Sequence, residues 1–183
     1  MYCGSNPTAL QSQQWIMASL IALMEEKPYS QITISDICKK ADLSRQTFYN
    51  VFDQKEDVLR FCLQNEYGRQ FQSVADHAVI SVEEIVGAFA AVLQKNEKLL
   101  SRMIQNGLDT IMADEIAKCV SLFADRFVRD PARISQLSYS KAILSGALAH
   151  VLVHWFRQET PISLPQLTGL ISDFLEGQLF VME

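Results

Sequence analysis

The sequence predicts an all-α protein of about nine helices, because apolar residues recur at helical spacing along almost the whole chain. Hydrophobic residues make up 49% of the 183 positions, which is enough to bury a sizeable core. Only seven glycines and five prolines are present, too few to punctuate the many short strands of an all-β protein. Most of the apolar segments also begin with a Ser, Thr, Asp or Asn that can cap a helix.

The first helix is predicted to run from Pro7 to about Glu26. Asn6 or Ser5 can cap it, and proline is favoured in a first helical turn. Lys27-Pro28 ends it, because the residue before a proline is pushed out of the α region. Residues 1–5 are expected to form a loose arm. The inward stripe of this helix, which braces the next two helices from behind, comprises Leu10, Ile16, Leu20, Leu23 and Met24.

The stretch from Ile32 to Lys55 has the pattern of a helix-turn-helix. Thr33 and Asp36 form a capping box, in which each side chain can bond to the backbone N–H of the other residue. Asp42-Leu43 supplies the turn, and Ser44 is a natural N-cap for the second helix. The inward positions of that second helix, at i, i+3 and i+4, are Phe48, Val51 and Phe52.

The outer face of the second helix is polar and carries no carboxylate. Arg, Gln and Asn side chains suit base edges in the major groove, whereas Thr and Tyr suit phosphates. The pattern therefore predicts a helix that reads the major groove. The net charge of −5 argues against non-specific coating of nucleic acid, so affinity is expected to rest on a few contacts and to fall steeply with salt. The outer residues are Arg45, Gln46, Thr47, Tyr49 and Asn50.

Several short motifs lie between Ile16 and Leu63 at a specific spacing: Lys27-Pro28-Tyr29-Ser30, Ile32-Thr33-Ile34, Asp36-Ile37, Ala41, Leu43-Ser44-Arg45, Thr47-Phe48-Tyr49, Phe52 and Lys55. With these motifs the run resembles the N-terminal DNA-binding domain of TetR-type transcriptional regulators, in the form found in low-GC Gram-positive bacteria. The resemblance covers about the first third of the chain. The remainder is similar to the family only in being helical and of suitable length.

The resemblance and the residue chemistry together assign roles on the predicted interface. Arg45 and Gln46 are expected to meet base edges, and Asn50 could serve bases or phosphates. Thr33 and Ser44 would place amides or hydroxyls on phosphates at helix N-termini. The side chains expected to contact the phosphate backbone are Thr47, Tyr49 and Lys55.

Two positions depart from the family pattern. Asp42 stands in the turn where the family often has glycine, and aspartate tolerates a left-handed conformation less easily. Gln54 stands where Ser or Thr often precedes the lysine. These departures leave the expected fold intact and bear on the detail of the phosphate contacts.

The second part of the chain is predicted from caps and breaks. A fourth helix should run from Gln54 to Asp76 or beyond, so that it links a domain of residues 1–53 to a helical ligand-binding and dimerisation domain of residues 54–183. Ser81 and Glu84 form a capping box for the next helix, which Lys95-Asn96 should end. The other expected helices lie at about 99–104, 109–129, 134–158 and 164–181.

A small-molecule site is expected in the second domain if the resemblance extends that far. Charged residues are scarce among the candidates, which suits an apolar or weakly polar effector. The alternative for each candidate is that its side chain only fills the core. His150 and His154 lie at i, i+4, yet no third ligand is evident, so no metal and no cofactor is expected. The candidate ligand residues are Phe89, Met103, Met112, Phe123, Tyr139, His150 and Trp155.

The last two predicted helices carry more apolar surface than one chain should need. Pairing of two such helices with their symmetry mates would make a four-helix bundle and a two-fold homodimer. The alternative is that these helices only close the core of the monomer. The candidate interface residues are Leu144, Leu148, Leu152, Leu167, Ile171, Phe174 and Leu175.

Cysteines and segment hydropathy indicate a reduced, cytoplasmic protein. Cys3, Cys38, Cys62 and Cys119 are far apart and form no metal-binding motif, although a redox-sensing pair of Cys38 with Cys62 stays open. The N-terminus lacks the pattern of a signal peptide, and no segment is long and apolar enough to cross a membrane. No phosphate-binding glycine loop or nucleophile motif is present, so neither an enzyme nor a catalytic residue is expected.

These inferences predict a dimeric DNA-binding transcriptional regulator, most readily a repressor released from a partly palindromic operator by a small-molecule effector. Two alternatives stay open: a coactivator or adaptor of the same fold controlled by a protein partner, and a thiol-based redox sensor. The sequence does not fix the operator, the effector, the sign of regulation or the regulated genes.

Overall fold

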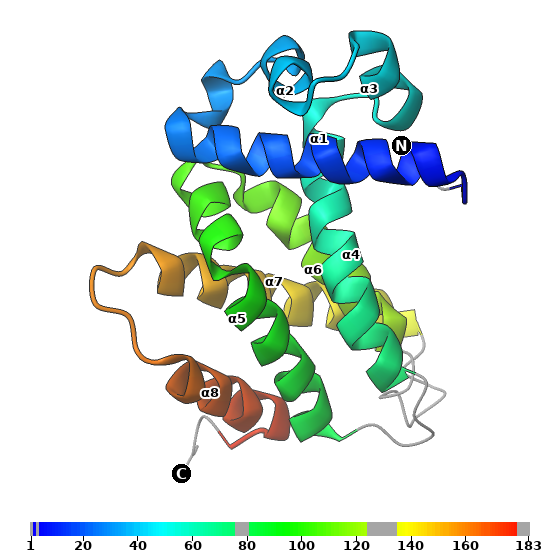
Figure 1. The fold of residues 1–183 in the computed structure, drawn as a ribbon. Helices are drawn as coiled ribbons and strands as arrows, with labels where there is room; N and C mark the ends of the chain where they lie inside the picture. The colour runs from blue at the N-terminus through cyan, green and yellow to red at the C-terminus, as the bar shows by residue number, and fades with distance from the viewer. Residues whose placement is uncertain (1, 3, 76–80, 124–134, 179–183) are drawn as a thin grey trace. The chain divides into compact units, whose positions relative to one another are not determined.

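The described part of the chain is entirely helical, as the sequence predicts. The computed structural model describes residue 2 and residues 4–75, 81–123 and 135–178, apart from a few side chains within these ranges. Eight α-helices and one short 3-10 helix lie in these residues (Figure 1). Contacts divide the chain into two units, residues 1–64 and 65–183, and the division falls within helix α4 (Lys55–Ala75). No helix in the described ranges is long and apolar enough to cross a membrane.

Unit 1 is built on the long helix α1 (Pro7–Glu26), on which α2 (Ile34–Ala41) and α3 (Arg45–Val51) pack. A 3-10 helix, η1 (Tyr29–Gln31), connects α1 to α2, and the first part of α4 completes the unit. Apolar side chains from every element meet in one buried core. Its fully buried large members are Ile16, Leu20, Ile32, Ile37, Phe48, Phe52, Leu59 and Leu63.

The start of α1 follows the predicted cap but not the predicted loose arm. The Asn6 side chain accepts a hydrogen bond from the N–H of Thr8 at 3.0 Å, and Pro7 is the first helical residue. Tyr2, however, is held in place. Its N–H donates to the carbonyl of Val51 at 2.8 Å, and its carbonyl accepts from the side-chain amide of Gln13 at 3.0 Å. These bonds satisfy one of the open carbonyls at the end of α3.

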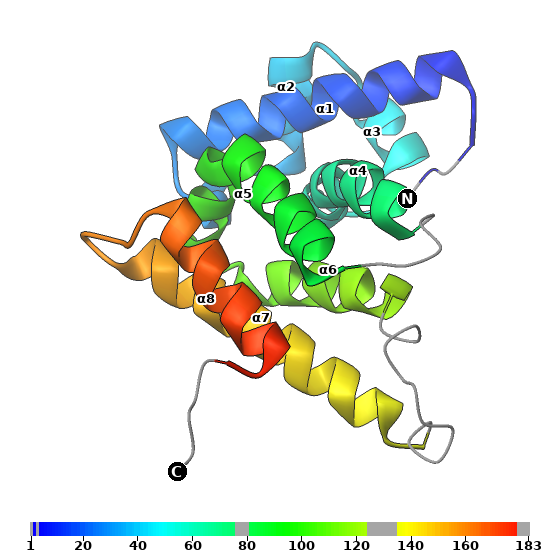
Figure 2. The ribbon, with the colours of Figure 1, turned by 90° about the horizontal axis from the view of Figure 1, so that it is seen from below.

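Unit 2 contains the rest of α4 together with α5 (Val82–Gln105), α6 (Asp109–Phe123), α7 (Leu137–Arg157) and α8 (Leu164–Glu176). Helix α5 packs on α7 and α8, and α6 packs on α7 (Figure 2). The capping box predicted at Ser81 is present, and Ser163 forms another one with Gln166. Buried side chains of the unit include Val92, Leu93, Leu100, Met103, Met112 and Leu152.

The predicted break at Lys95-Asn96 is wrong. Helix α5 continues through it to Gln105, because the Asn96 side chain bonds to the carbonyl of Val92 at 2.9 Å within the same helix and does not cap it. Two predicted helices are therefore one, which lowers the count from nine to eight in the described residues. Helix α8 ends earlier than predicted, at Glu176, because Gly177 adopts a left-handed conformation with φ of +74°.

Candidate nucleic-acid interface

The capping box at the start of α2 fixes the entry to the helix-turn-helix. The Thr33 hydroxyl accepts from the N–H of Asp36 at 3.1 Å, and Asp36 accepts from the N–H of Thr33 at 2.8 Å. The same carboxylate lies 2.9 Å from the ammonium of Lys27. The hydrogen bond from Lys27 and those from Thr33 hold the pKa of the Asp36 carboxyl well below its usual range. Thr33 is exposed at the N-terminus of α2, where the sequence places it.

The turn between α2 and α3 is closed through Asp42. This residue is the only one besides glycine with a positive φ in the described chain, at φ of +54°, which is the left-handed region. The N–H of Leu43 donates to the carbonyl of Cys38 at 3.0 Å and so satisfies the end of α2. A glycine would occupy this conformation without strain, but aspartate is among the residues that tolerate it best.

Helix α3 presents the predicted polar face. Ser44 caps it by accepting from the N–H of Thr47 at 3.0 Å. Phe48 and Val51 are buried, as the spacing predicts. Tyr49 is 47% exposed, and its ring meets the edge of Phe48 with centroids 5.6 Å apart. The outer residues that the structure leaves exposed beside it are Arg45, Gln46 and Asn50, with Thr47 partly exposed.

Lys55 occupies a different environment from the rest of the predicted set. Its ammonium donates to the carbonyls of Tyr29 at 2.9 Å and Ile32 at 3.0 Å, and lies 4.1 Å from the centroid of the Tyr29 ring. The Tyr29 hydroxyl in turn donates to Glu56 at 2.8 Å. Burial, followed by this bond to Glu56, raises the pKa of Tyr29. The ammonium thus fastens the segment between α1 and α2 to the start of α4.

The candidate ligand residues of unit 2 are mostly not gathered around one space. A cavity lies in this unit, and Phe89 is the one candidate that lines it. Met103 and Met112 are buried elsewhere in the core, whereas Tyr139 and His150 are exposed. The other two do not line it either: the Trp155 indole N–H donates to the carbonyl of Ile162 at 2.7 Å, and the Phe123 side chain lies outside the described residues.

The candidates chosen from the sequence were mainly methionines and aromatic residues after α4, so most of the residues that line the cavity were missed. Tyr67 and Phe71, at i, i+4 on α4, are both buried and both line the cavity. Their spacing was a usable signal, since such a pair marks one face of a helix. Cys119 also lines the cavity, and burial followed by Glu115 raises the pKa of its thiol to about 12.

The candidate dimer residues divide into core and surface. Leu148, Leu152, Leu167 and Ile171 are buried in unit 2 by the packing of α7 and α8 against its other helices, so these side chains belong to the core of the chain itself. Leu144 and Leu175 are half-buried, and Phe174 is 36% exposed. The large apolar side chains that stay exposed on these two helices are Tyr139, Ile143, Leu170 and Phe174.

Two of the described cysteines, Cys38 and Cys119, offer little thiolate chemistry. Cys38, Cys62 and Cys119 form no disulfide bond with one another, and Cys3 lies outside the described residues. Burial raises the pKa of both Cys38 and Cys119, which keeps these thiols protonated and slows their oxidation. No group of three potential metal ligands is present among the described residues.

A family model for bacterial regulatory proteins of the TetR family matches residues 16–61. This segment contains the capping box, the turn and the exposed face of α3. Residues 16–61 of this chain are therefore similar to the TetR family. Members of this family regulate transcription and are not enzymes, which agrees with the expectation from the motifs.

Two curated relatives match over about a third of this chain. The transcriptional activator DhaS of the dhaKLM operon, from Lactococcus lactis, is 33% identical over 66 residues, which is 36% of this chain and 35% of the relative. An uncharacterised helix-turn-helix regulator of Bacillus subtilis, YxbF, is 38% identical over 64 residues, which is 35% of this chain and 16% of the relative. These alignments therefore span about a third or less of each relative's length.

The fold of the whole chain is similar to a solved structure. The protein Lin0861 of Listeria innocua superposes with a TM-score of 0.72 at 16% identity, covering 97% of this chain and 96% of that one. A structural similarity at this sequence identity shows the fold alone. The helical fold of unit 2, where the sequence motifs give no guidance, therefore has a counterpart in a solved structure.

Proposed function

We propose that this chain is a homodimeric, DNA-binding regulator of transcription whose operator affinity is set by a small molecule in unit 2. The observation that carries the proposal is the exposed, carboxylate-free face of α3 in a head that matches the family model. Arg45 and Gln46 lie on that face and would contact base edges. Tyr49 and Asn50 lie on the same exposed face and would contact the backbone or bases.

Dimerisation supplies the second half-site that one small head lacks. Tyr139 and Ile143 lie at i, i+4 on α7 and are 73% and 69% exposed. Leu170 and Phe174 repeat that spacing on α8, so each helix turns one apolar face outward. A second copy of the chain is the proposed occupant, because two-fold pairing of these faces matches a partly palindromic operator. Gly146, also exposed on α7, leaves room for close approach.

Coupling between ligand and DNA is assigned to α4, which contributes residues to both units. A ligand that binds unit 2 more tightly in the form with low operator affinity shifts the population toward that form. The size of the switch equals the difference between the ligand's affinities for the two forms. In the proposed direction of regulation, the protein represses transcription and the ligand relieves the repression.

The first test is an anisotropy titration of the protein against its own upstream DNA at two salt concentrations. Tyr49→Ala and Arg45→Ala should each weaken operator binding at least tenfold, which corresponds to about 1.4 kcal/mol. Leu122→Ala serves as the control, because Leu122 is 50% exposed on α6 and belongs to no proposed surface. Wild-type affinity in both variants of α3, with folding intact, would refute the assignment of this face.

The dimer is tested separately by sedimentation. Ile143→Glu and Phe174→Glu should each shift the protein from dimer to monomer, because a charge would be buried at the interface. Leu122→Glu places the same charge on another exposed apolar position and should leave the dimer unchanged. A dimer that survives both interface variants would exclude the α7–α8 face.

A second candidate is a coactivator or activator of the same fold. The relative DhaS is named a transcriptional activator, and its match covers 36% of this chain. A reporter gene fused to the upstream DNA, measured with and without the regulator, gives the sign directly. If expression rises with the protein, the repressor proposal fails and the activator is correct. DNA binding that requires a co-purified protein would favour the adaptor.

A further inference from the structure

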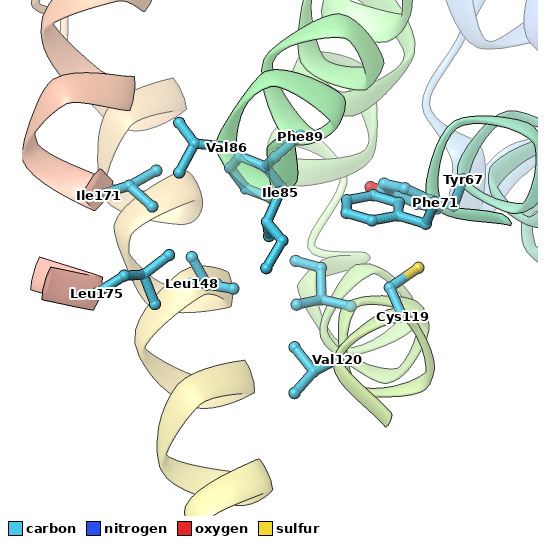
Figure 3. A pocket seen from close by; sticks show the side chains of 11 residues that line it. Tyr67, Phe71, Ile85, Val86, Phe89, Cys119, Val120, Leu148, Ile171 and Leu175 are labelled. Carbon is cyan, nitrogen blue, oxygen red and sulfur yellow. The ribbon is translucent and has the colours of Figure 1, made fainter. Parts of the chain in front are cut away.

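The cavity in unit 2 lies among five helices. It encloses about 20 Å³, which is room for about one water molecule. Figure 3 shows its lining side chains converging from α4, α5, α6, α7 and α8. Almost all of them are aliphatic or aromatic: Tyr67, Phe71, Ile85, Val86, Phe89, Ile116, Cys119, Val120, Leu148, Ile171 and Leu175.

Tyr67 lines this apolar space and carries a buried hydroxyl, which the cavity in its present form does not expose. The residue is 2% exposed, and its hydroxyl has no hydrogen-bond partner among the described residues. Buried hydroxyls are normally paired, because an unpaired one loses its bonds to water without replacement. A phenylalanine would fill the same volume without that loss. Packing alone therefore does not explain why this lining residue carries a hydroxyl.

The charge around the cavity disfavours an anion. None of the lining residues that the structure describes carries a positive charge. The carboxylate of Glu115, which is 2% exposed, is close enough to raise the pKa of both Tyr67 and Cys119, in each case after the larger effect of burial. Lys118, 2.6 Å from this carboxylate, lowers the pKa of Cys119, and its effect is smaller than that of Glu115. A ligand carboxylate would enter an apolar space near a buried negative charge.

We propose that the cavity is the closed form of a site for a neutral, largely aliphatic molecule with a single hydroxyl or carbonyl group, which pairs with the hydroxyl of Tyr67. This inference rests on the proposed role of unit 2 as the ligand-responsive domain and names the class of ligand. The cavity must widen on binding, since its present volume holds about one water. Widening separates helices that include α4, so occupancy is coupled to the helix that both units share.

The test compares six-carbon probes of different charge by calorimetric titration of the full chain without DNA. Hexan-2-one should bind at least tenfold more tightly than hexanoate or hexylammonium, because only the neutral probe avoids burying a charge. Tyr67→Phe should weaken hexan-2-one binding about fivefold to tenfold through loss of the hydrogen bond. Leu122→Ala is the control, since Leu122 is 50% exposed and is not among the residues that line the cavity, and it should change nothing.

A second readout separates a binding role of Tyr67 from a purely structural one. The ligand-free Tyr67→Phe protein should unfold at a higher temperature than wild type, because the unpaired buried hydroxyl is gone. Stabilisation together with weaker probe binding supports the site.

Three results would overturn the proposal: equal hexan-2-one affinity in wild type and Tyr67→Phe, preferential binding of hexanoate, or saturation by no probe. The last would assign the cavity to one structural water. Failure of the proposed function would give a different result. A probe would bind the wild-type protein through Tyr67, but operator affinity would not change.

Discussion

Lys55 provides the sharpest test of how the head is held together. Its ammonium donates to two backbone carbonyls and lies 4.1 Å from the centre of the Tyr29 ring. A hydrogen bond to a charged group contributes about 1.5 kcal/mol or more, and a cation–π contact about 0.5 kcal/mol. Because these interactions share one partly exposed ammonium, Lys55→Met should lower the free energy of unfolding of unit 1 by about 2–3 kcal/mol.

The assay is urea unfolding followed by fluorescence. The chain has two tryptophans, Trp15 in unit 1 and Trp155 in unit 2, so Trp155→Phe leaves a reporter that belongs to the head alone. The control is Lys40→Met, which removes a surface ion pair between Lys40 and Glu26 at 2.7 Å. Exposed pairs of this kind contribute about 0–1 kcal/mol, so the control should lose much less stability.

The salt dependence of operator binding separates this structural role from the phosphate contact that the family resemblance implies. A lysine on a phosphate adds about 0.9 to the slope of log affinity against log salt concentration. If Lys55 holds the head together instead, the slope should be unchanged in Lys55→Met once the protein is folded. A slope that falls by about one per head, with a stability loss no larger than that of Lys40→Met, would refute the structural reasoning.

Three further outcomes follow from the charges and conformations described above. Asp42→Asn keeps a residue suited to φ of +54° and removes a carboxylate beside α3. Operator affinity, measured by anisotropy, should therefore rise several-fold at low salt. The free energy of unfolding, measured by urea titration, should change by less than about 0.5 kcal/mol. Because the pKa of Asp36 is lower in the folded than in the unfolded chain, its contribution to stability is complete above about pH 4 and is lost as the pH falls further. Asp36→Asn should remove this pH dependence from acid-unfolding curves. Because the pKa of Cys119 is raised to about 12, its thiolate fraction at pH 8 is about 10⁻⁴, and mass spectrometry should find it alkylated far more slowly in the folded than in the unfolded chain.

The helix boundaries of the head could be predicted because the signals that set them are local. Thr33 and Ser44 cap their helices through residues three positions away, and the same relation holds for Ser81 and Ser163 in unit 2. Asn96 shows the limit of this reasoning. An asparagine side chain can cap a helix or bond within one, and the sequence alone does not tell which carbonyl or N–H lies closest.

The cavity and the proposed dimer face depend on which side of each helix meets its own core. Helices α7 and α8 carry apolar residues around wide arcs, so periodicity could not tell Leu152, which is buried, from Ile143, which is 69% exposed. Tyr67 was missed for a related reason. Its burial depends on the packing of helices distant in sequence, and its unpaired hydroxyl becomes visible only when all its neighbours are placed.

Helix α3 has only seven residues, too few to persist as an isolated helix. It is nevertheless secured at both termini, by the Ser44 side chain at its start and by the N–H of Tyr2 on the carbonyl of Val51 at its end. A reading helix that is already ordered loses little conformational entropy when it meets the duplex. The heat-capacity change of operator binding should then follow from the apolar area buried, without the added negative contribution of coupled folding. Residues at the start of the chain thereby influence the thermodynamics of recognition even if they never contact DNA.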